Sequence, residues 1–213
     1  MQLNKKNIKI IDNFLKKKDF NKLSNLKVSI KSKNDIKVLH NKIDKNNYIQ
    51  TSVIERNFLI NLQKSYHKKA ISILKKLCPK KLNLYDYSEF HIVKTGANFK
   101  FPIHDDTPDK LLSGVIYLNP SINKGTIFYK NIDKKEKKTI KWKKNRAVFF
   151  SRKEKETWHS YEGDGKKNRL ALVYNLMTYN LKKVYEIEKK NYWLGMLRFK
   201  LNPHIFRFFN KII

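Results

Sequence analysis

Residues 99–120 read FKFPIHDDTPDKLLSGVIYLNP, and within them His104 and Asp106 lie two positions apart, just before a long apolar run. Because residues i and i+2 of an extended strand point to the same face, both side chains are predicted to face inward. Asp105 lies between them and is predicted to face away, where it would bind substrate or cap a turn. The His-x-Asp pair by itself is a weak signal, so its meaning depends on the residues that join it.

Two residues further along the chain complete the pattern. His159 lies in ETWHSYEGDG, and Arg169 follows it by ten positions in KKNRLALVYNLM. Two imidazoles and one carboxylate form the facial triad that holds non-heme Fe(II) and leaves coordination positions open. A guanidinium beside such a site suits a carboxylate ligand, since its planar fork binds one bidentately. The alternative for Arg169, a surface position in the basic run KKNR, conflicts with the alternation of the apolar run that it begins.

Residues 8–178 resemble the Fe(II)/2-oxoglutarate-dependent dioxygenases, specifically their prolyl-4-hydroxylase-like branch. The resemblance rests on the order H-x-D, His, Arg and on five segments that occur in the family's order: IKIIDNFL, GVIYLNP, GTIFY, NRAVFFS and WHSY. It implies an O2-dependent hydroxylation of a C–H bond, coupled to oxidative decarboxylation of 2-oxoglutarate to succinate and CO2. The implied cofactors are Fe(II) and 2-oxoglutarate, with O2 as oxidant and ascorbate as a candidate reductant.

The resemblance also implies a role for each candidate residue. His104, Asp106 and His159 would bind the iron at the catalytic centre, Arg169 would bind the C5 carboxylate of 2-oxoglutarate, and Tyr117 would contact the same cosubstrate. Since halogenating members of the family lack the carboxylate ligand, its presence here predicts hydroxylation.

One position departs from the family pattern. Lys94 stands where a tyrosine often contacts the cosubstrate. Nucleic-acid repair members usually carry a second arginine at the position of Asn175, so repair chemistry is disfavoured.

The pattern of short segments rich in Val, Ile, Phe and Tyr indicates a β-rich core. Turn residues such as Asn119-Pro120 separate these segments, and evenly spaced short strands are typical of a sandwich or barrel. The resemblance makes the expected fold a double-stranded β-helix, a cupin-like jelly roll that is mostly β with flanking helices (α+β). The predicted strands are residues 85–94, 100–103, 111–118, 126–130, 137–142, 147–151 and 169–177.

The rest of the chain is expected to flank this core. Residues 1–178 are predicted to form one dioxygenase domain, with N-terminal helices within residues 12–77 and the β-helix core at 83–178. Asp12 or Asn13 is expected to cap the first helix, which would run to about residue 26. A strand pair is expected at residues 28–39, and an apolar stripe predicts a long helix at 53–77.

Residues 179–213 lie beyond the resemblance and mix basic with large apolar residues at helical spacing, with a break expected at Asn202-Pro203. Three interpretations remain open: packing on the core, which is favoured, a homo-oligomer contact, or a basic amphipathic segment on a membrane surface.

The composition limits which binding partners are expected. The net charge of +30 is typical of proteins that bind nucleic acid, anionic lipid or acidic substrates. The lysines are scattered, however, and Asn and Ile are also abundant, which favours the bias of an AT-rich genome. A single cysteine, Cys78, excludes an internal disulfide. The chain shows no signal peptide and no run of about 20 apolar residues, so we expect a cytoplasmic protein without a transmembrane segment.

The substrate class stays open among small molecules, glycan precursors and peptidyl groups. Two alternatives to an enzyme are a basic nucleic-acid-binding protein, which is disfavoured, and a non-catalytic cupin-like module. The other histidines are assigned structural roles, with His67 expected in solvent and His91 facing inward. Arg152 is expected either to meet an acidic substrate or to lie in a solvated loop, and Trp142 and Trp158 to belong to the core or a pocket wall.

Overall fold

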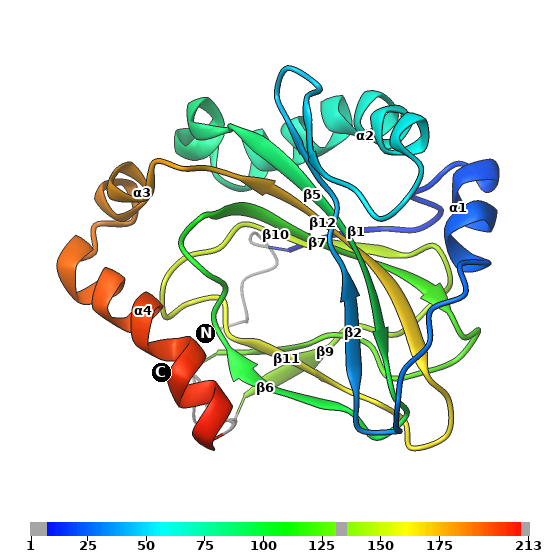
Figure 1. The fold of residues 1–213 in the computed structure, drawn as a ribbon. Helices are drawn as coiled ribbons and strands as arrows, with labels where there is room; N and C mark the ends of the chain where they lie inside the picture. Colours follow the sequence, from blue (N-terminus) through cyan, green and yellow to red (C-terminus); the bar gives the residue numbers. More distant parts are fainter. Residues whose placement is uncertain (1–7, 131–135, 210–213) are drawn as a thin grey trace.

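The computed structural model describes residues 8–130 and 136–209, with the backbone alone described for residues 203 and 205–209. Within these ranges the strands form two antiparallel sheets that face each other (Figure 1). The large sheet has the order β1 (Ile8–Ile11), β10 (Ala147–Phe150), β7 (Lys110–Asn119), β12 (Arg169–Met177), β5 (Tyr87–Thr95), β3 (Lys42–Asp44) and β4 (Ile49–Thr51), and β2 (Ile36–Leu39) also pairs with β5. The small sheet has the order β6 (Lys100–His104), β11 (His159–Glu162), β8 (Ile127–Tyr129) and β9 (Lys137–Thr139).

Helices cover the outer face of the large sheet. The long helix α2 (Arg56–Leu77) lies across it, and the shorter α1 (Lys17–Ser24) lies at its side (Figure 1). Pro79 lies two residues after the last residue of α2 and opens the 3-10 helix η2 (Pro79–Leu84). The predicted fold class, a mostly β jelly roll with flanking helices, is confirmed by this arrangement.

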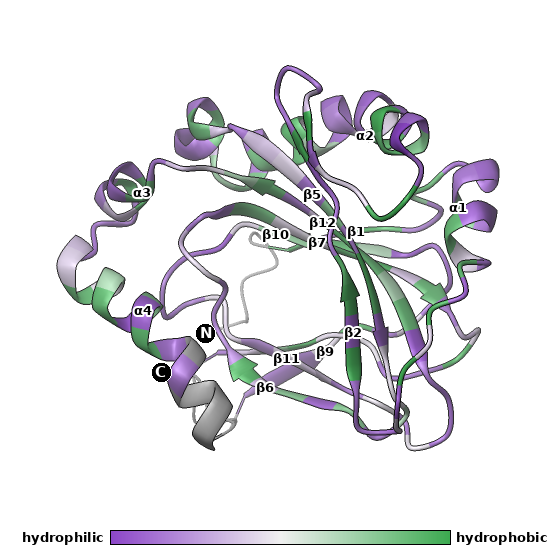
Figure 2. Cartoon of the chain, in the orientation of Figure 1, coloured by the Kyte–Doolittle hydropathy of each residue, from purple (hydrophilic) through white to green (hydrophobic). Residues whose placement is uncertain are grey.

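The main core lies between the large sheet and α2, because alternate residues of each strand point to opposite faces. Phe90 of β5 and Tyr174 of β12 face α2 and stack with ring centres 4.2 Å apart. Leu59 and Leu62 approach from α2 and are fully buried. Burying one such leucine stabilises the fold by about 1.5–3 kcal/mol. Figure 2 shows that strands of the large sheet are largely hydrophobic, whereas α1 and α2 mix hydrophobic and hydrophilic residues.

A second, smaller core fills part of the space between the two sheets. Tyr117 of β7 and Trp142 stack there with ring centres 4.3 Å apart, and Phe128 packs edge-on against Phe150. The residues of the large sheet that do not face α2 therefore point toward the small sheet, into the space where the candidate site lies.

Several local predictions need correction. Neither Asp12 nor Asn13 caps α1, which begins at Lys17. The Asp12 carboxylate instead accepts hydrogen bonds from Arg146 at 2.6 and 3.0 Å, and Asn13 adopts a positive φ of 52°. These long-range contacts hold the chain in a turn where a helix start was expected.

The predicted strand pair at 28–39 is reduced to β2, since only that part of the chain finds a partner in β5. The strands β3 and β4 were not predicted, and α2 begins three residues later than expected.

The C-terminal segment forms α3 (Leu181–Glu188) and α4 (Tyr192–Phe209), which lie at one end of the two sheets (Figure 1). Val184 and Tyr185 of α3 are buried, and a Cβ at Gly195 of α4 would fall within 2.2 Å of the Tyr185 ring. The predicted break at Asn202-Pro203 is wrong, because α4 continues through it. Among the described helices, none combines the length and the apolar character that crossing a membrane requires.

Candidate active site

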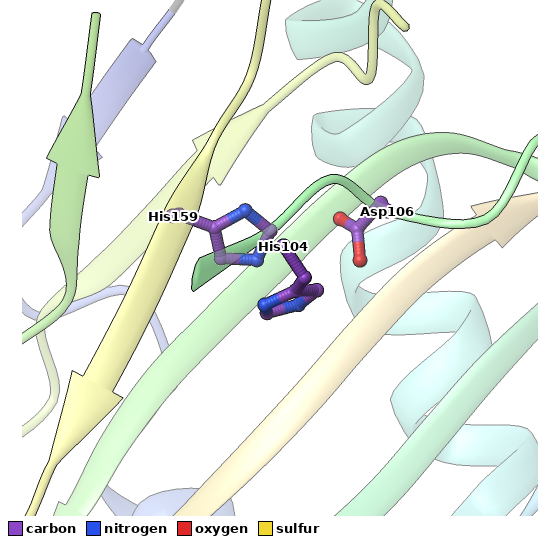
Figure 3. A group of neighbouring side chains, drawn as sticks. All are labelled: His104, Asp106 and His159. Carbon is purple, nitrogen blue, oxygen red and sulfur yellow. The ribbon is translucent and has the colours of Figure 1, made fainter. Parts of the chain in front are cut away.

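The pairing of β6 with β11 brings two candidate ligands together from distant parts of the chain. His159 lies directly opposite His104 in this antiparallel pair, and the two ring centres are 4.1 Å apart. Asp106 follows two residues after His104, and one ligand atom from each of the three side chains lies within 4.8 Å of the others. Figure 3 shows the two imidazoles and the carboxylate directed into one space. Among the described residues, no other group of three His, Cys, Asp or Glu side chains is close enough to hold a metal ion.

The histidines are oriented by the backbone. Nδ1 of His104 lies 3.0 Å from the carbonyl oxygen of Pro102, and Nδ1 of His159 lies 2.9 Å from that of Thr157. A neutral imidazole that donates its Nδ1 proton to a carbonyl keeps a lone pair on Nε2, which is the form that binds metals. Burial lowers the pKa of His104 to about 3 and also lowers the pKa of His159. Both rings are therefore neutral at pH 7.

Asp106 is held as a carboxylate by two neighbours that sequence analysis did not select. Lys110 Nζ donates to Oδ1 at 2.6 Å, and Ser113 Oγ donates to Oδ2 at 2.5 Å. Burial would raise the pKa of Asp106, but the charge of Lys110 and its hydrogen bond hold the pKa well below its ordinary value. Ser113 could have been found from strand alternation, since it shares the inward face of β7 with Val115 and Tyr117.

Asp106 and not Asp105 lies with the two histidines, as predicted, but strand alternation is not the reason. β6 ends at His104, so both aspartates lie in the loop beyond it and not on a strand. Asp105 turns away because its carboxylate accepts hydrogen bonds from the Lys155 backbone at 2.5 Å and from Thr157 Oγ1 at 2.9 Å. These contacts hold Asp105 outside the group of three candidate ligands.

Arg169 is the first residue of β12 and points into the same interior. Its guanidinium carbon lies 4.3 Å from the ring centre of Tyr161 and 5.1 Å from that of Trp142. The residue is 4% exposed, yet its Nε and Nη1 have no hydrogen-bond partner among the residues that the structure describes. Two N–H donors of this buried guanidinium are therefore available to a carboxylate, which such a fork binds bidentately.

Tyr117 lies beside Arg169 but its hydroxyl is already engaged. It donates to Thr126 Oγ1 at 2.9 Å and accepts from the Thr126 backbone N–H at 2.8 Å. Its ring is fully buried against Trp142. Contact with 2-oxoglutarate stays a prediction; because that cosubstrate offers only acceptor oxygens, the hydroxyl would have to donate to it in place of Thr126 Oγ1. Tyr161, which sequence analysis did not select, is two residues after His159 and contacts Arg169 directly.

A cavity of about 290 Å3 adjoins His104 and Asp106. The loop after β6 forms one side of it, and α3 and α4 form another through Tyr185 and Phe199. Arg198 of α4 also lines the cavity and donates from Nη1 to Glu154 Oε1 at 2.6 Å. The C-terminal helices therefore contribute a wall to the cavity next to the three candidate ligands.

Arg152 does not lie in a solvated loop, but it lines the cavity, so its contact with an acidic substrate stays a prediction. It is 3% exposed, and its Nη1 donates to Glu188 Oε2 at 2.6 Å. Lys81 Nζ donates to the other oxygen of Glu188 at 2.7 Å. The buried carboxylate of Glu188 compensates the charge of this buried guanidinium, so Arg152 joins α3 to the core.

The structure also shows where two other histidines and two tryptophans lie. His67 is partly buried against the Tyr85 ring, with centres 4.7 Å apart, so its predicted exposure to solvent is wrong. His91 Nε2 lies 3.2 Å from Glu89 Oε2, which also accepts from Asn175 Nδ2 at 3.2 Å. Trp142 and Trp158 are buried, as predicted.

The sequence matches no protein-family model and no curated protein, whereas many solved structures share its fold. A prolyl-4-hydroxylase from Pseudomonas putida is 14% identical, with 82% of this chain and 94% of that chain covered and a TM-score of 0.54. A 2OG-Fe(II) oxygenase family oxidoreductase from Burkholderia pseudomallei is 13% identical, with 84% and 88% covered and a TM-score of 0.59.

A third similar structure is a prolyl hydroxylase from Trichoplax adhaerens, in complex with a hypoxia inducible factor oxygen degradation domain peptide fragment. It is 16% identical, with 85% of this chain and 88% of that chain covered and a TM-score of 0.55. At these identities the likeness establishes the fold. The resemblance to the prolyl-4-hydroxylase-like oxygenases is confirmed at that level.

Proposed function

We propose that this chain, which has the fold of the 2OG-Fe(II) oxygenases, is an Fe(II)- and 2-oxoglutarate-dependent dioxygenase that hydroxylates a C–H bond of its substrate. His104, Asp106 and His159 would hold the iron, and Arg169 would hold the C5 carboxylate of 2-oxoglutarate. One observation supports this proposal most strongly. The same interior contains a two-histidine, one-carboxylate group and a buried arginine whose Nε and Nη1 have no partner in the described part of the chain.

The donor set fits Fe(II). Two neutral imidazoles and one carboxylate leave coordination positions open for other ligands. When bound, the iron supplies the redox chemistry that amino-acid side chains lack. The chain's own task is to hold the donors in place: two backbone carbonyls orient the imidazoles, and Lys110 and Ser113 orient the carboxylate. Outer partners of this kind commonly change metal affinity by 10- to 100-fold.

The interior also fits a dicarboxylate cosubstrate. Arg169 presents two unpartnered nitrogens in a buried setting, where a charge-assisted pair is stronger than in water. Tyr161 and Trp142 lie against the guanidinium and limit its movement. These aromatic walls also exclude water from the carboxylate site.

We place the substrate in the cavity beside His104 and Asp106. Its volume of about 290 Å3 is at the lower limit of small-molecule sites. The cavity therefore favours a small molecule, or one side chain or terminal group of a larger molecule such as a glycan precursor or a peptide.

The proposal is tested by anaerobic titration with Fe(II) and 2-oxoglutarate, followed by aerobic measurement of succinate release with ascorbate as reductant. We expect the wild-type protein to bind both ligands and to release succinate only when iron is present. His104→Ala should abolish both metal binding and succinate release. The matched control is His204→Ala, which removes an exposed histidine of α4 and should change neither. Succinate release at the wild-type rate by His104→Ala would refute the proposal, as would a wild-type protein that binds neither ligand.

A further inference from the structure

The helix α4 carries apolar side chains on two sides. On its inner side Gly195 approaches Tyr185, and Phe199 lines the cavity. On its outer side large apolar residues are exposed to solvent. They are Trp193, Leu194, Leu197 and Leu201, with 78%, 64%, 56% and 42% of their surfaces exposed. We call these four residues the outer face of α4.

The spacing of the outer face produces one continuous stripe. Trp193, Leu197 and Leu201 follow one another at intervals of four residues, and Leu194 precedes Leu197 by three, so all four lie on one side of the helix. A single exposed leucine is ordinary, but a helix that is apolar on both sides normally has both sides covered. Contiguous exposed apolar residues of this kind are typical of interaction sites.

The charges near this stripe identify the partner. Residues 179–213 contain eight lysines and arginines but only two glutamates. Glu188 is buried between Lys81 and Arg152, so it contributes no negative charge to the surface. Three lysines are exposed: Lys182 on α3, Lys189 between the two helices and Lys200 on α4. The apolar stripe therefore belongs to a segment with an excess of positive charge, which is complementary to an anionic surface.

An anionic membrane fits this surface better than a second copy of the chain. Two copies would bring two net charges of +30 together and repel each other. Anionic lipids attract lysines, and tryptophan favours the level of the headgroups. Since no described helix is able to span a bilayer, α4 would lie in the plane of the interface.

We propose that the outer face of α4 binds to the surface of an anionic membrane. The opposite side of the same helix lines the cavity, so membrane binding would bring the cavity next to the bilayer. The proposal depends on the surface of α4 and holds whether or not the chain is an oxygenase.

The test uses the full chain with two kinds of vesicle, one of phosphatidylcholine and one of equal parts phosphatidylcholine and phosphatidylglycerol. We expect co-sedimentation with the anionic vesicles and little with the neutral ones. Tryptophan emission reports the contact directly, because Trp142 and Trp158 are 5% and 6% exposed whereas Trp193 is 78% exposed. A blue shift on adding anionic vesicles would thus report burial of Trp193.

Leu197→Glu should weaken binding to the anionic vesicles at least about tenfold, since it removes one buried leucine and adds a negative charge. The matched control is Ile122→Glu, which makes the same kind of change at a residue that is 79% exposed. Ile122 follows β7 at the end opposite Lys110, about 30 Å from the cavity. We expect this control to bind like the wild type.

Three results would overturn the proposal. The first is the absence of vesicle binding. The second is equal binding by wild type and Leu197→Glu, which would assign the contact to scattered lysines. The third is a dimer in solution that buries Trp193 without lipid, because it would identify a second copy as the partner.

Discussion

The guanidinium of Arg169 lies over the ring of Tyr161, with 4.3 Å between the guanidinium carbon and the ring centre. This contact fixes the position of a side chain that is 4% exposed and has two nitrogens without partners among the described residues. Burial lowers the pKa of Arg169, but an arginine stays charged in proteins. Arg169 is therefore a buried cation that forms no ion pair within the described part of the chain.

Arg169→Met is expected to weaken 2-oxoglutarate binding without lowering the stability of the fold. It should weaken 2-oxoglutarate binding at least about 100-fold, since two charge-assisted hydrogen bonds of about 1.5–3 kcal/mol each are lost. The ligand-free variant should be at least as stable as the wild type, because a buried unpaired charge is removed. Calorimetric titration with Mn(II) present and urea unfolding measure the two effects.

The control for this variant is Arg146→Met. Arg146 is a surface arginine whose fork pairs with Asp12, so its loss should leave 2-oxoglutarate affinity unchanged. Wild-type affinity in Arg169→Met would show that the dicarboxylate binds elsewhere.

Ser113→Ala should weaken metal binding without removing a ligand. The hydroxyl donates to Asp106 Oδ2 at 2.5 Å, and losing such an outer partner typically costs 10- to 100-fold in affinity. Titration with Co(II) measures the change. Ser160→Ala is the matched control, because Ser160 neighbours His159 but bonds to Tyr129 at 2.9 Å. If both variants lose the same affinity, Ser113 has no specific role in positioning Asp106.

Glu188→Gln should destabilise the protein far more than Glu186→Gln. Both glutamates are on α3 and accept from a lysine at 2.7 Å, but the Glu188 side chain is 2% exposed and that of Glu186 is 48% exposed. Neutralising Glu188 leaves Lys81 and Arg152 buried without their counter-charge, which costs about 3–5 kcal/mol. The exposed pair should contribute at most about 1 kcal/mol. Urea unfolding of both variants provides the comparison, and similar losses would contradict the buried network.

The stability of the metal-free protein should depend on the protonation of His104. Its pKa is about 3 in the folded state, because of burial, against an ordinary value of 6.5. The unfolded chain therefore binds more protons between pH 3 and 6.5, and the free energy of unfolding falls as pH decreases through that window. From pH 7 to pH 5 this histidine alone removes about 2 kcal/mol.

The comparison with His104→Ala isolates this effect. Burial raises the pKa of Asp105 to about 6, and protonation of that carboxyl in the folded state acts in the opposite direction. Because Asp105 is present in both proteins, its effect cancels in the difference between them. Urea unfolding at pH 7 and pH 5 should show the wild type losing about 2 kcal/mol more than the variant. Equal losses would contradict the neutral, buried state of His104.

Patterns along single strands were sufficient to predict much of the candidate site. The strand of Arg169 was predicted with its observed bounds, and its inward alternation holds because the side-chain period of a strand is local. The selection of His104, Asp106 and His159 depended on residue type and order, which are also properties of the sequence. The turn at Asp12 and the partial loss of the strand pair at 28–39 were missed, since both depend on contacts with residues far along the chain.

The sequence by itself determined the chemical types of the candidate site and the β-rich class of the fold, because both follow from residue identity and short-range periodicity. Only the tertiary structure decided that His159 pairs with His104 across two strands, that Ser113 and Lys110 hold Asp106, and that Glu188 is buried between two cations. It also decided that α4 lies against the cavity. These relationships arise from strand register and long-range packing, which depend on the free energy of the whole chain and leave no local pattern in the sequence.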